Sequence, residues 1–335
     1  MHTDSYSSAD QNMDFNAQYK ADVRIGHGYA HSKIILMGEH SVVYDYPAIA
    51  FPFQAADVQV KIKPLFKGST ILNSDYYRGK LTSAPEEFNN IKAVVNATIE
   101  SFNFPNQPLE ITVNSTIPAE RGMGSSAAVA VAIVRGLCDL YEQEIPDQQL
   151  YFLANQAEVI AHESTSGLDT LVASTISPVI YRKSQKPHPF EIDIEAYLVV
   201  ADSGEVGQTK LAVSKVRQLK DKKSAFVTKT MKAIGDFVQR AYQAIQDKQV
   251  EELGRLMTYN HYYLNQLGVS NTTLDQIVNA AWMAGALGAK LTGGGLGGCV
   301  IALAKDADDA RYIAEAMEAM GAQTTWTVNL SKSNS

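Results

Sequence analysis

The feature that most constrains this chain is a glycine loop that runs directly into an apolar stretch of small residues. The loop GMGSS at 122–126 is followed by Ala127–Leu140, which is too long for an average strand and predicts a buried helix. Gly122 and Gly124 let the backbone adopt positive φ and approach a ligand closely. A helix that begins behind such a loop gathers unpaired N–H groups and the positive end of its dipole. The loop therefore predicts an anion site, with a glycine turn capped by a serine as the alternative.

The hydroxyls of Ser125 and Ser126 add a second property to this loop. Oxygen ligands of this kind suit Mg²⁺, which keeps phosphate and water in its other positions. The P-loop pattern GxxxxGK[ST] and the dinucleotide-binding glycine pattern are both absent from the sequence. We therefore expect phosphate binding of another type.

A second glycine loop occupies residues 292–298, with the sequence TGGGLGG between two apolar strands. Five glycines in seven residues weaken a strand, so this density indicates a tight turn or a close backbone contact. A flexible hairpin is the alternative.

Several charged residues could supply phosphoryl-transfer chemistry, which needs a metal ligand, a proton acceptor and positive charge near the reacting oxygens. Glu158 together with Ser126 could hold the metal, Asp169 could accept the proton, and Lys33 could supply the charge. A cation beside Asp169 would keep it ionised and favour a substrate alkoxide. Each of these residues could instead be a surface charge or part of an ordinary ion pair, and taken singly Glu158, Glu39 and Lys33 are better explained in that way. His40, beside Glu39, is more often a structural histidine than a ligand.

The pattern of the chain predicts an α+β protein of about two domains, because its strands and helices do not alternate regularly. Strands are expected at 32–37, 41–44, 56–63, 68–74 and 109–117. Helices are expected at 85–103 and 147–162, the second burying Leu150, Leu153, Ala157 and Ile160. Residues 1–20 are polar and predict a frayed tail. The polar segment at 183–189 is the best linker, so we place one domain at 21–185 and the other at 186–335.

Composition excludes several classes of protein. The net charge of −7 argues against a nucleic-acid surface. No apolar run is long enough to span a membrane, and the first residues lack the pattern of a secretory signal. Cys138 and Cys299 lie far apart in apolar or glycine-rich surroundings and predict free thiols. Together these features lead us to expect a cytoplasmic protein.

Three segments resemble, in order and spacing, the motifs of the GHMP kinase superfamily, whose members phosphorylate small molecules such as galactose, homoserine, mevalonate and phosphomevalonate. The segments are HSKIILMGEHSVVYDYPAIA (31–50), PAERGMGSSAAVAVAIV (118–134) and KLTGGGLGGCVIAL (290–303). SGLDT (166–170) and DSGEVGQTKLAVSKV (202–216) are most similar to the branch that acts on mevalonate, particularly its bacterial members. The sequence departs from the superfamily pattern at His31-Ser32, where many members have Pro-Gly, and at Leu296 in the third motif.

The resemblance implies a fold and a reaction. The fold would be an N-terminal domain like ribosomal protein S5 followed by a ferredoxin-like C-terminal domain. The reaction would be ATP- and Mg²⁺-dependent phosphorylation of the C5 hydroxyl of mevalonate. Asp169 would be the base and Lys33 its cationic partner, while Ser126 and Glu158 would bind Mg²⁺. The residues implied to wrap the ATP phosphates are Gly122, Met123, Gly124, Ser125, Ser126 and Ala127.

The acceptor site implied by the resemblance would be bordered by Glu39, His40, Thr209 and Gly294. The expected partner is a small molecule, with no nucleic acid and no membrane, and the family leaves a homodimer open. The alternatives are a phosphomevalonate or homoserine kinase, a related ATP-dependent decarboxylase, and a non-catalytic sensor that binds nucleotide. A phosphorylated acceptor would need extra positive charge, and the acceptor segments add only Lys210. A sensor would be expected to lack the base or a metal ligand.

Overall fold

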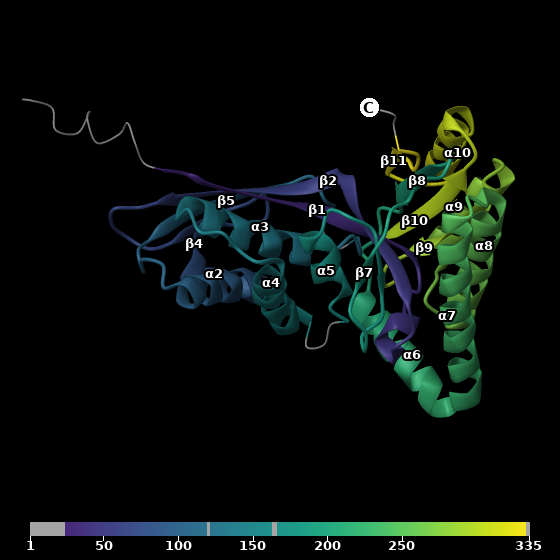
Figure 1. Ribbon diagram of the computed structural model, residues 1–335, viewed down its shortest axis with the longest axis horizontal. Helices are drawn as coiled ribbons and strands as arrows, with labels where there is room; N and C mark the ends of the chain where they lie inside the picture. The colour runs from purple at the N-terminus through teal and green to yellow at the C-terminus, as the bar shows by residue number, and fades with distance from the viewer. Residues whose placement is uncertain (1–23, 119–120, 163–165, 333–335) are drawn as a thin grey trace, which may run out of the picture.

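The computed structural model describes residues 24–118, 121–162 and 166–332. The predicted tail at 1–20 lies outside the described residues. Within those ranges the chain forms two antiparallel-rich sheets, each covered by helices (Figure 1).

The first sheet is built on two long strands, β1 and β2, which pair antiparallel along most of their length. β5 and β6 pair with β2 at different points along it, β3 lies parallel to β5, and β4 and β7 extend the two ends of the sheet. Alternating burial along the second half of β2 reflects its sequence, in which apolar and polar residues alternate as expected for a half-buried strand. The strands are β1 (Gly26–Met37), β2 (Ala48–Pro64), β3 (Ile71–Asn73), β4 (Arg78–Lys80), β5 (Leu109–Ser115), β6 (Val179–Tyr181) and β7 (His188–Pro189).

Helices cover one side of this sheet (Figure 1). α3 packs closely on β1 and β2. A Cβ on Gly28 would come within 1.8 Å of the Ala132 carbonyl oxygen, so there is no room for a side chain at that position of the strand. The small residues of the predicted apolar helix therefore allow the helix to lie directly on the strand. The helices are α2 (Asn89–Phe102), α3 (Ser125–Leu140), α4 (Asp147–His162) and α5 (Leu168–Ser174).

The second sheet has the strand order β11-β8-β10-β9, with every neighbouring pair antiparallel. Helices intervene between β8 and β9 and between β10 and β11, so the sheet is ferredoxin-like, as expected. Its strands are β8 (Tyr197–Asp202), β9 (Gly288–Thr292), β10 (Cys299–Ala304) and β11 (Thr324–Asn329). Its helices are α6 (Thr209–Lys222), α7 (Ser224–Gln246), α8 (Val250–Gln266), α9 (Thr272–Met283) and α10 (Ala307–Ala319).

Two local predictions were wrong. Residues 41–44 form a 3-10 helix, η1 (Ser41–Tyr44), rather than a strand. The chain turns at Gly38, and the Ser41 hydroxyl and the Val42 N–H both donate to the Gly38 carbonyl, which holds the segment in a helical turn. Ile160 is 54% exposed rather than buried. The last turns of α4 direct Glu158 toward the loop at 122–126, so the core-facing stripe ends before Ile160.

The polar segment at 183–189 ends in β7, which pairs with β6, while the second sheet begins at Tyr197. Both Cys138 and Cys299 are free and buried, in agreement with the sequence analysis. Among the described residues, no helix combines the length and apolar character needed to cross a membrane.

Candidate active site

The glycine loop at 122–126 is held against β1. Gly122 and Gly124 have φ values of 73° and 72°, which a residue with a side chain adopts only at a cost. The Lys33 N–H donates to the Met123 carbonyl over 3.0 Å, and a Cβ on Gly124 would come within 2.9 Å of Lys33 Cγ. The loop therefore rests on the aliphatic part of Lys33, and α3 begins just behind it at Ser125.

Ser126 and Glu158 meet at the start of α3. The Ser126 hydroxyl donates to Glu158 Oε1 over 2.5 Å and accepts a hydrogen bond from Asn90 Nδ2 over 2.8 Å. Asn90 lies near the start of α2 and is buried. The sequence analysis did not single it out, and its only signal is an amide on the apolar side of that helix.

The electrostatic setting of Glu158 is unusual for a carboxylate. Its pKa is raised to about 7. Burial is the main cause and the nearby Asp169 adds to it, while the Ser126 hydroxyl and Lys33 act in the opposite direction. A carboxylic acid with a pKa near neutral pH readily loses its proton when a cation binds to it.

This donor set fits Mg²⁺. Ser126 and Glu158 provide hard oxygen atoms that already lie within 2.5 Å of each other. In the described part of the chain no group of three or more His, Cys, Asp or Glu side chains gathers as a metal cage. Mg²⁺ that carries substrate phosphates is typically held by only one or two protein carboxylates, so two protein ligands are sufficient.

Lys33 and Asp169 form the next pair along the site. Lys33 Nζ lies 3.1 Å from Asp169 Oδ1, with 3% of the lysine side chain exposed and 37% of the aspartate. Asp169 stands in the first turn of α5, which follows Gly167 at a φ of 78°. The buried cation thus fixes one side of the carboxylate while the other side stays open.

Three of the predicted acceptor-site residues come together on the second domain's side. His40 Nε2 lies 2.9 Å from the Gly294 carbonyl oxygen, and a Cβ on Gly294 would come within 2.3 Å of Thr209 Oγ1. Burial lowers the pKa of His40 to about 4, so the ring is neutral at pH 7. Because a carbonyl can only accept, the proton of that neutral ring is on Nε2.

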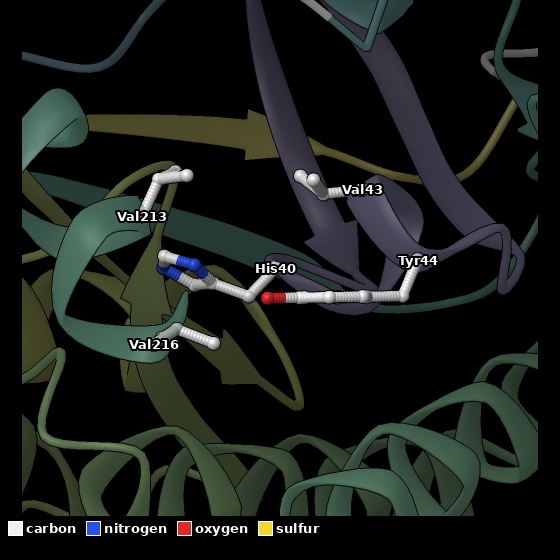
Figure 2. A pocket seen from close by; sticks show the side chains of 5 residues that line it. All are labelled: His40, Val43, Tyr44, Val213 and Val216. Atoms are coloured by element: carbon white, nitrogen blue, oxygen red, sulfur yellow. The ribbon is translucent and has the colours of Figure 1, made fainter. Parts of the chain in front are cut away.

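A small pocket of about 140 Å³ adjoins His40 (Figure 2). Figure 2 shows the imidazole ring between Val213 and Val216 of α6, with Val43 and Tyr44 of η1 on the other side. The walls of this pocket are apolar apart from the ring and the tyrosine hydroxyl.

Glu39, the remaining acceptor-site candidate, points into the interior. Its Oε1 accepts a hydrogen bond from Lys290 Nζ, and neither side chain has exposed surface. Lys290 also donates to the Leu291 carbonyl over 2.6 Å. Burial raises the pKa of Glu39 and lowers that of Lys290, and their mutual attraction opposes both shifts. The sequence analysis did not identify Lys290, since a lysine inside an apolar strand gives no indication of its partner.

The two glycine loops are in contact. A Cβ on Gly293 would lie 2.9 Å from the Gly122 carbonyl oxygen, and one on Gly298 would lie 2.7 Å from that of Arg121. Leu296 adopts a φ of 55°, and its side chain is buried in the second domain's core. The second loop is therefore a packed turn whose bare backbone faces the first loop, and not a flexible hairpin.

Arg121, which precedes the first loop, adds an ion pair across the same boundary. Its Nε lies 3.0 Å from Asp202 Oδ1 at the end of β8. Both side chains are largely buried, and the sequence analysis singled out neither.

A wider hollow opens beside the first turn of α3, with about 450 Å³ of space including its mouth. Its walls are mostly apolar, and Ser125 is one of the residues that line it. The lining residues are Ser74, Asp75, Tyr76, Phe88, Ile91, Val113, Ser115, Ile117, Ser125 and Val129.

Comparisons with known proteins agree on one family. The model of the GHMP kinases N terminal domain matches residues 89–177, and the model of the GHMP kinases C terminal domain matches residues 241–323. Mevalonate kinase from Pyrococcus furiosus is 33% identical over 316 residues, which cover 87% of this chain and 92% of that protein.

Solved structures give the same result. Mevalonate kinase from methicillin-resistant Staphylococcus aureus matches with a TM-score of 0.71 and 33% identity, over 92% of this chain and 100% of that one. Mevalonate kinase from L. major, solved in complex with R-mevalonate, matches with a TM-score of 0.77 and 27% identity, over 92% and 97% of the two chains.

Proposed function

The chain belongs to the GHMP kinase family, and we propose that it transfers the γ-phosphoryl group of ATP to the C5 hydroxyl of mevalonate, giving 5-phosphomevalonate. Its similarity to mevalonate kinases covers nearly the whole chain. The observation that carries the proposal is the Lys33–Asp169 pair, which holds an open carboxylate close to the Ser126–Glu158 pair at the start of α3.

ATP is the phosphoryl donor. Its phosphates would lie on the loop formed by residues 122–127, where positive φ at two glycines turns backbone N–H groups toward the N-terminus of α3. The hollow beside Ser125 would take the apolar face of the base. Nucleotide and loop would therefore meet at the first turn of a buried helix.

Ser126 and Glu158 would hold the Mg²⁺ that accompanies the nucleotide. When bound, the ion neutralises charge on the phosphates and supports the transferring group. Asn90 fixes the Ser126 hydroxyl in place by donating to it, so the ligand oxygen is oriented before the metal arrives.

Asp169 would accept the proton of the attacking hydroxyl. Lys33 holds the carboxylate in place and would also stabilise negative charge on the acceptor oxygen as the proton leaves. The acceptor would lie between this pair and the wall made by His40, Thr209 and Gly294. Phosphoryl transfer needs little covalent help from a protein, so most of the rate would come from positioning and electrostatics.

Two domains would enclose this site. We place the boundary between residues 185 and 186, close to the interval between β7 and β8. The glycine loop and the pair of carboxylates would belong to the first domain, and Thr209 and Gly294 to the second.

A coupled assay of ADP release tests the proposal. The protein is incubated with ATP and Mg²⁺ and offered mevalonate, phosphomevalonate, homoserine and galactose in parallel. Turnover confined to mevalonate supports the assignment. Turnover of another acceptor would keep the kinase and reject the substrate. If folded protein that binds ATP released no ADP with any of the four acceptors, the result would point to the non-catalytic sensor. Light scattering on the same preparation tests the homodimer.

A further inference from the structure

Lys290 and Glu39 form a charged pair that the reaction as described does not use. Both are fully buried, one on β9 and the other in the turn that follows β1. Burying two charges costs free energy, and an apolar pair in their place is often neutral or stabilising. The pair therefore calls for an explanation other than stability.

The surroundings of the pair point to the catalytic residues. Thr292, two residues beyond Lys290, donates to the Ile35 carbonyl over 2.8 Å and accepts from the Ile35 N–H over 3.2 Å. Ile35 lies two residues from Lys33 on β1, so these bonds fix the end of β9 beside the strand that carries Lys33. His40, directly after Glu39, is bonded in the same way to Gly294.

Lys33 therefore lies within electrostatic reach of two carboxylates and a second ammonium. Its charge acts on Glu39 and on Lys290 as well as on Glu158, and its direct partner is Asp169 at 3.1 Å. Charges alternate along the line Lys290, Glu39, Lys33, Asp169. An unpaired Glu39 carboxylate in this dry setting would attract Lys33 strongly, because attraction between charges grows as water is excluded.

We infer that Lys290 is a positioning residue. By binding the buried Glu39 carboxylate, it allows Lys33 to form its ion pair with Asp169. The inference rests on the proposed function, in which Asp169 is the base and Lys33 its partner. The Lys290 side chain has no exposed surface, so it would touch neither the acceptor nor the nucleotide.

Lys290→Met tests this role, because methionine keeps the length of the side chain and removes its charge. We expect kcat for ADP release to fall about 100-fold, since a Lys33 that has moved toward Glu39 no longer holds Asp169 in position for the acceptor hydroxyl. The KM for ATP should stay within twofold of the wild-type value. Lys248→Met is the matched control: that lysine pairs with Asp193 at the surface of the second domain, and its loss should leave kcat unchanged.

The double variant Glu39→Gln/Lys290→Met separates positioning from packing. With the Glu39 carboxylate removed, Lys33 should return to Asp169 and kcat should recover to within about fivefold of wild type. This variant also carries no unpaired buried charge, so it folds even where Lys290→Met does not. Folding is checked by circular dichroism and thermal melting. A double variant that is folded but at least 30-fold impaired would overturn the inference, as would a fully active Lys290→Met.

Crystal structures of the variants give a readout that does not depend on the acceptor. In Lys290→Met we expect Lys33 Nζ within hydrogen-bond distance of Glu39 and more than 4 Å from Asp169. A Lys33–Asp169 distance unchanged from 3.1 Å in that variant would contradict the inference. If instead the wild type failed to turn over mevalonate, the proposed function would fall, and these distances would still decide the role of Lys290.

Discussion

Lys33 and Asp169 lie 3.1 Å apart, one on β1 and the other in the first turn of α5. The lysine is buried by the glycine loop that rests on its side chain, whereas the carboxylate keeps an open side. A buried cation that holds an accessible carboxylate is the arrangement expected for a base that must stay ionised and meet a substrate.

Asp169→Asn should lower kcat for ADP release about 1,000-fold, because the amide has the same size but cannot accept the hydroxyl proton. The Kd for ATP, measured by calorimetry, should stay within about threefold, since the ion-pair partner of Asp169 is Lys33 and not a residue of the loop at 122–126.

The matched control is Asp193→Asn. Asp193 is 40% exposed and pairs with Lys248 over 2.7 Å, so it has nearly the exposure and the same type of partner as Asp169. Its variant should keep wild-type kcat. An Asp169→Asn enzyme with more than a tenth of wild-type kcat would remove Asp169 from the role of base.

Glu158 should make Mg²⁺ binding depend on pH. Its pKa of about 7 means that the carboxylate is protonated below that pH and is then a poor ligand. The Mg²⁺ concentration that gives half-maximal rate should therefore rise as pH falls, by about tenfold per unit below pH 7. The rate of ADP release is measured against Mg²⁺ at pH 6, 7 and 8 with saturating substrates.

In Glu158→Gln the half-maximal Mg²⁺ concentration should be higher throughout and should lose this dependence on pH. Glu142→Gln, which changes an exposed carboxylate at the end of α3, serves as the control. Equal Mg²⁺ requirements in wild type and Glu158→Gln would rule out Glu158 as a ligand.

His40 should make the folded protein less stable in mild acid. Its pKa falls from 6.5 to about 4 on burial, so between these values the unfolded chain binds a proton that the folded chain does not. The contribution of neutral His40 to the free energy of unfolding is complete above pH 6.5. It is lost as the pH falls toward 4, by about 3 kcal/mol in total. Urea unfolding at several pH values measures it.

The comparison with His40→Gln isolates this residue, because the second buried histidine, His261, is present in both proteins. The variant should lose less stability between pH 7 and pH 4.5 than the wild type. Identical pH dependence in the two proteins would show that His40 takes up its proton in the folded state.

Gly294→Ala should damage the acceptor side of the site. The added Cβ would lie 2.3 Å from Thr209 Oγ1 and 2.8 Å from Thr209 Cα, so α6 or the loop must move. We expect kcat/KM for the acceptor to fall at least tenfold, roughly what a shift of less than 1 Å costs. ATP affinity should change little.

Gly268→Ala is the contrasting control. Gly268 has a φ of 75° and nothing within 4 Å of an added Cβ, so its substitution should cost about 1 kcal/mol of stability without altering acceptor kinetics. Acceptor kinetics that are equally impaired in both variants would show that a general loss of stability, and not the contact with Thr209, is responsible.

The local structure was largely predictable from the sequence. The loop at 122–126 and the helix behind it were expected because glycine at positive φ and a long run of small apolar residues leave few other conformations. The two apolar strands on either side of the loop at 292–298 were expected as well, and they form β9 and β10. The prediction at 41–44 was wrong because a segment of four residues is too short to distinguish a strand from a helical turn.

Candidate roles could be assigned from the sequence only where a motif names the residue, as for Lys33, Ser126, Glu158 and Asp169, and these roles stay predictions. No local pattern indicates that Asn90 bonds Ser126 or that Arg121 pairs with Asp202. Such contacts join residues on different elements, and nothing in either element specifies the other.

The sequence by itself therefore determined the glycine loops, the helix that follows the first of them, and the types of side chain available for phosphoryl transfer. The tertiary structure alone decided that Arg121 would pair with Asp202 and Glu39 with Lys290. The physical reason is that backbone sterics and hydrophobic periodicity act over a few residues, whereas the partner of a buried charge is chosen by whichever elements the packed sheets and helices bring together.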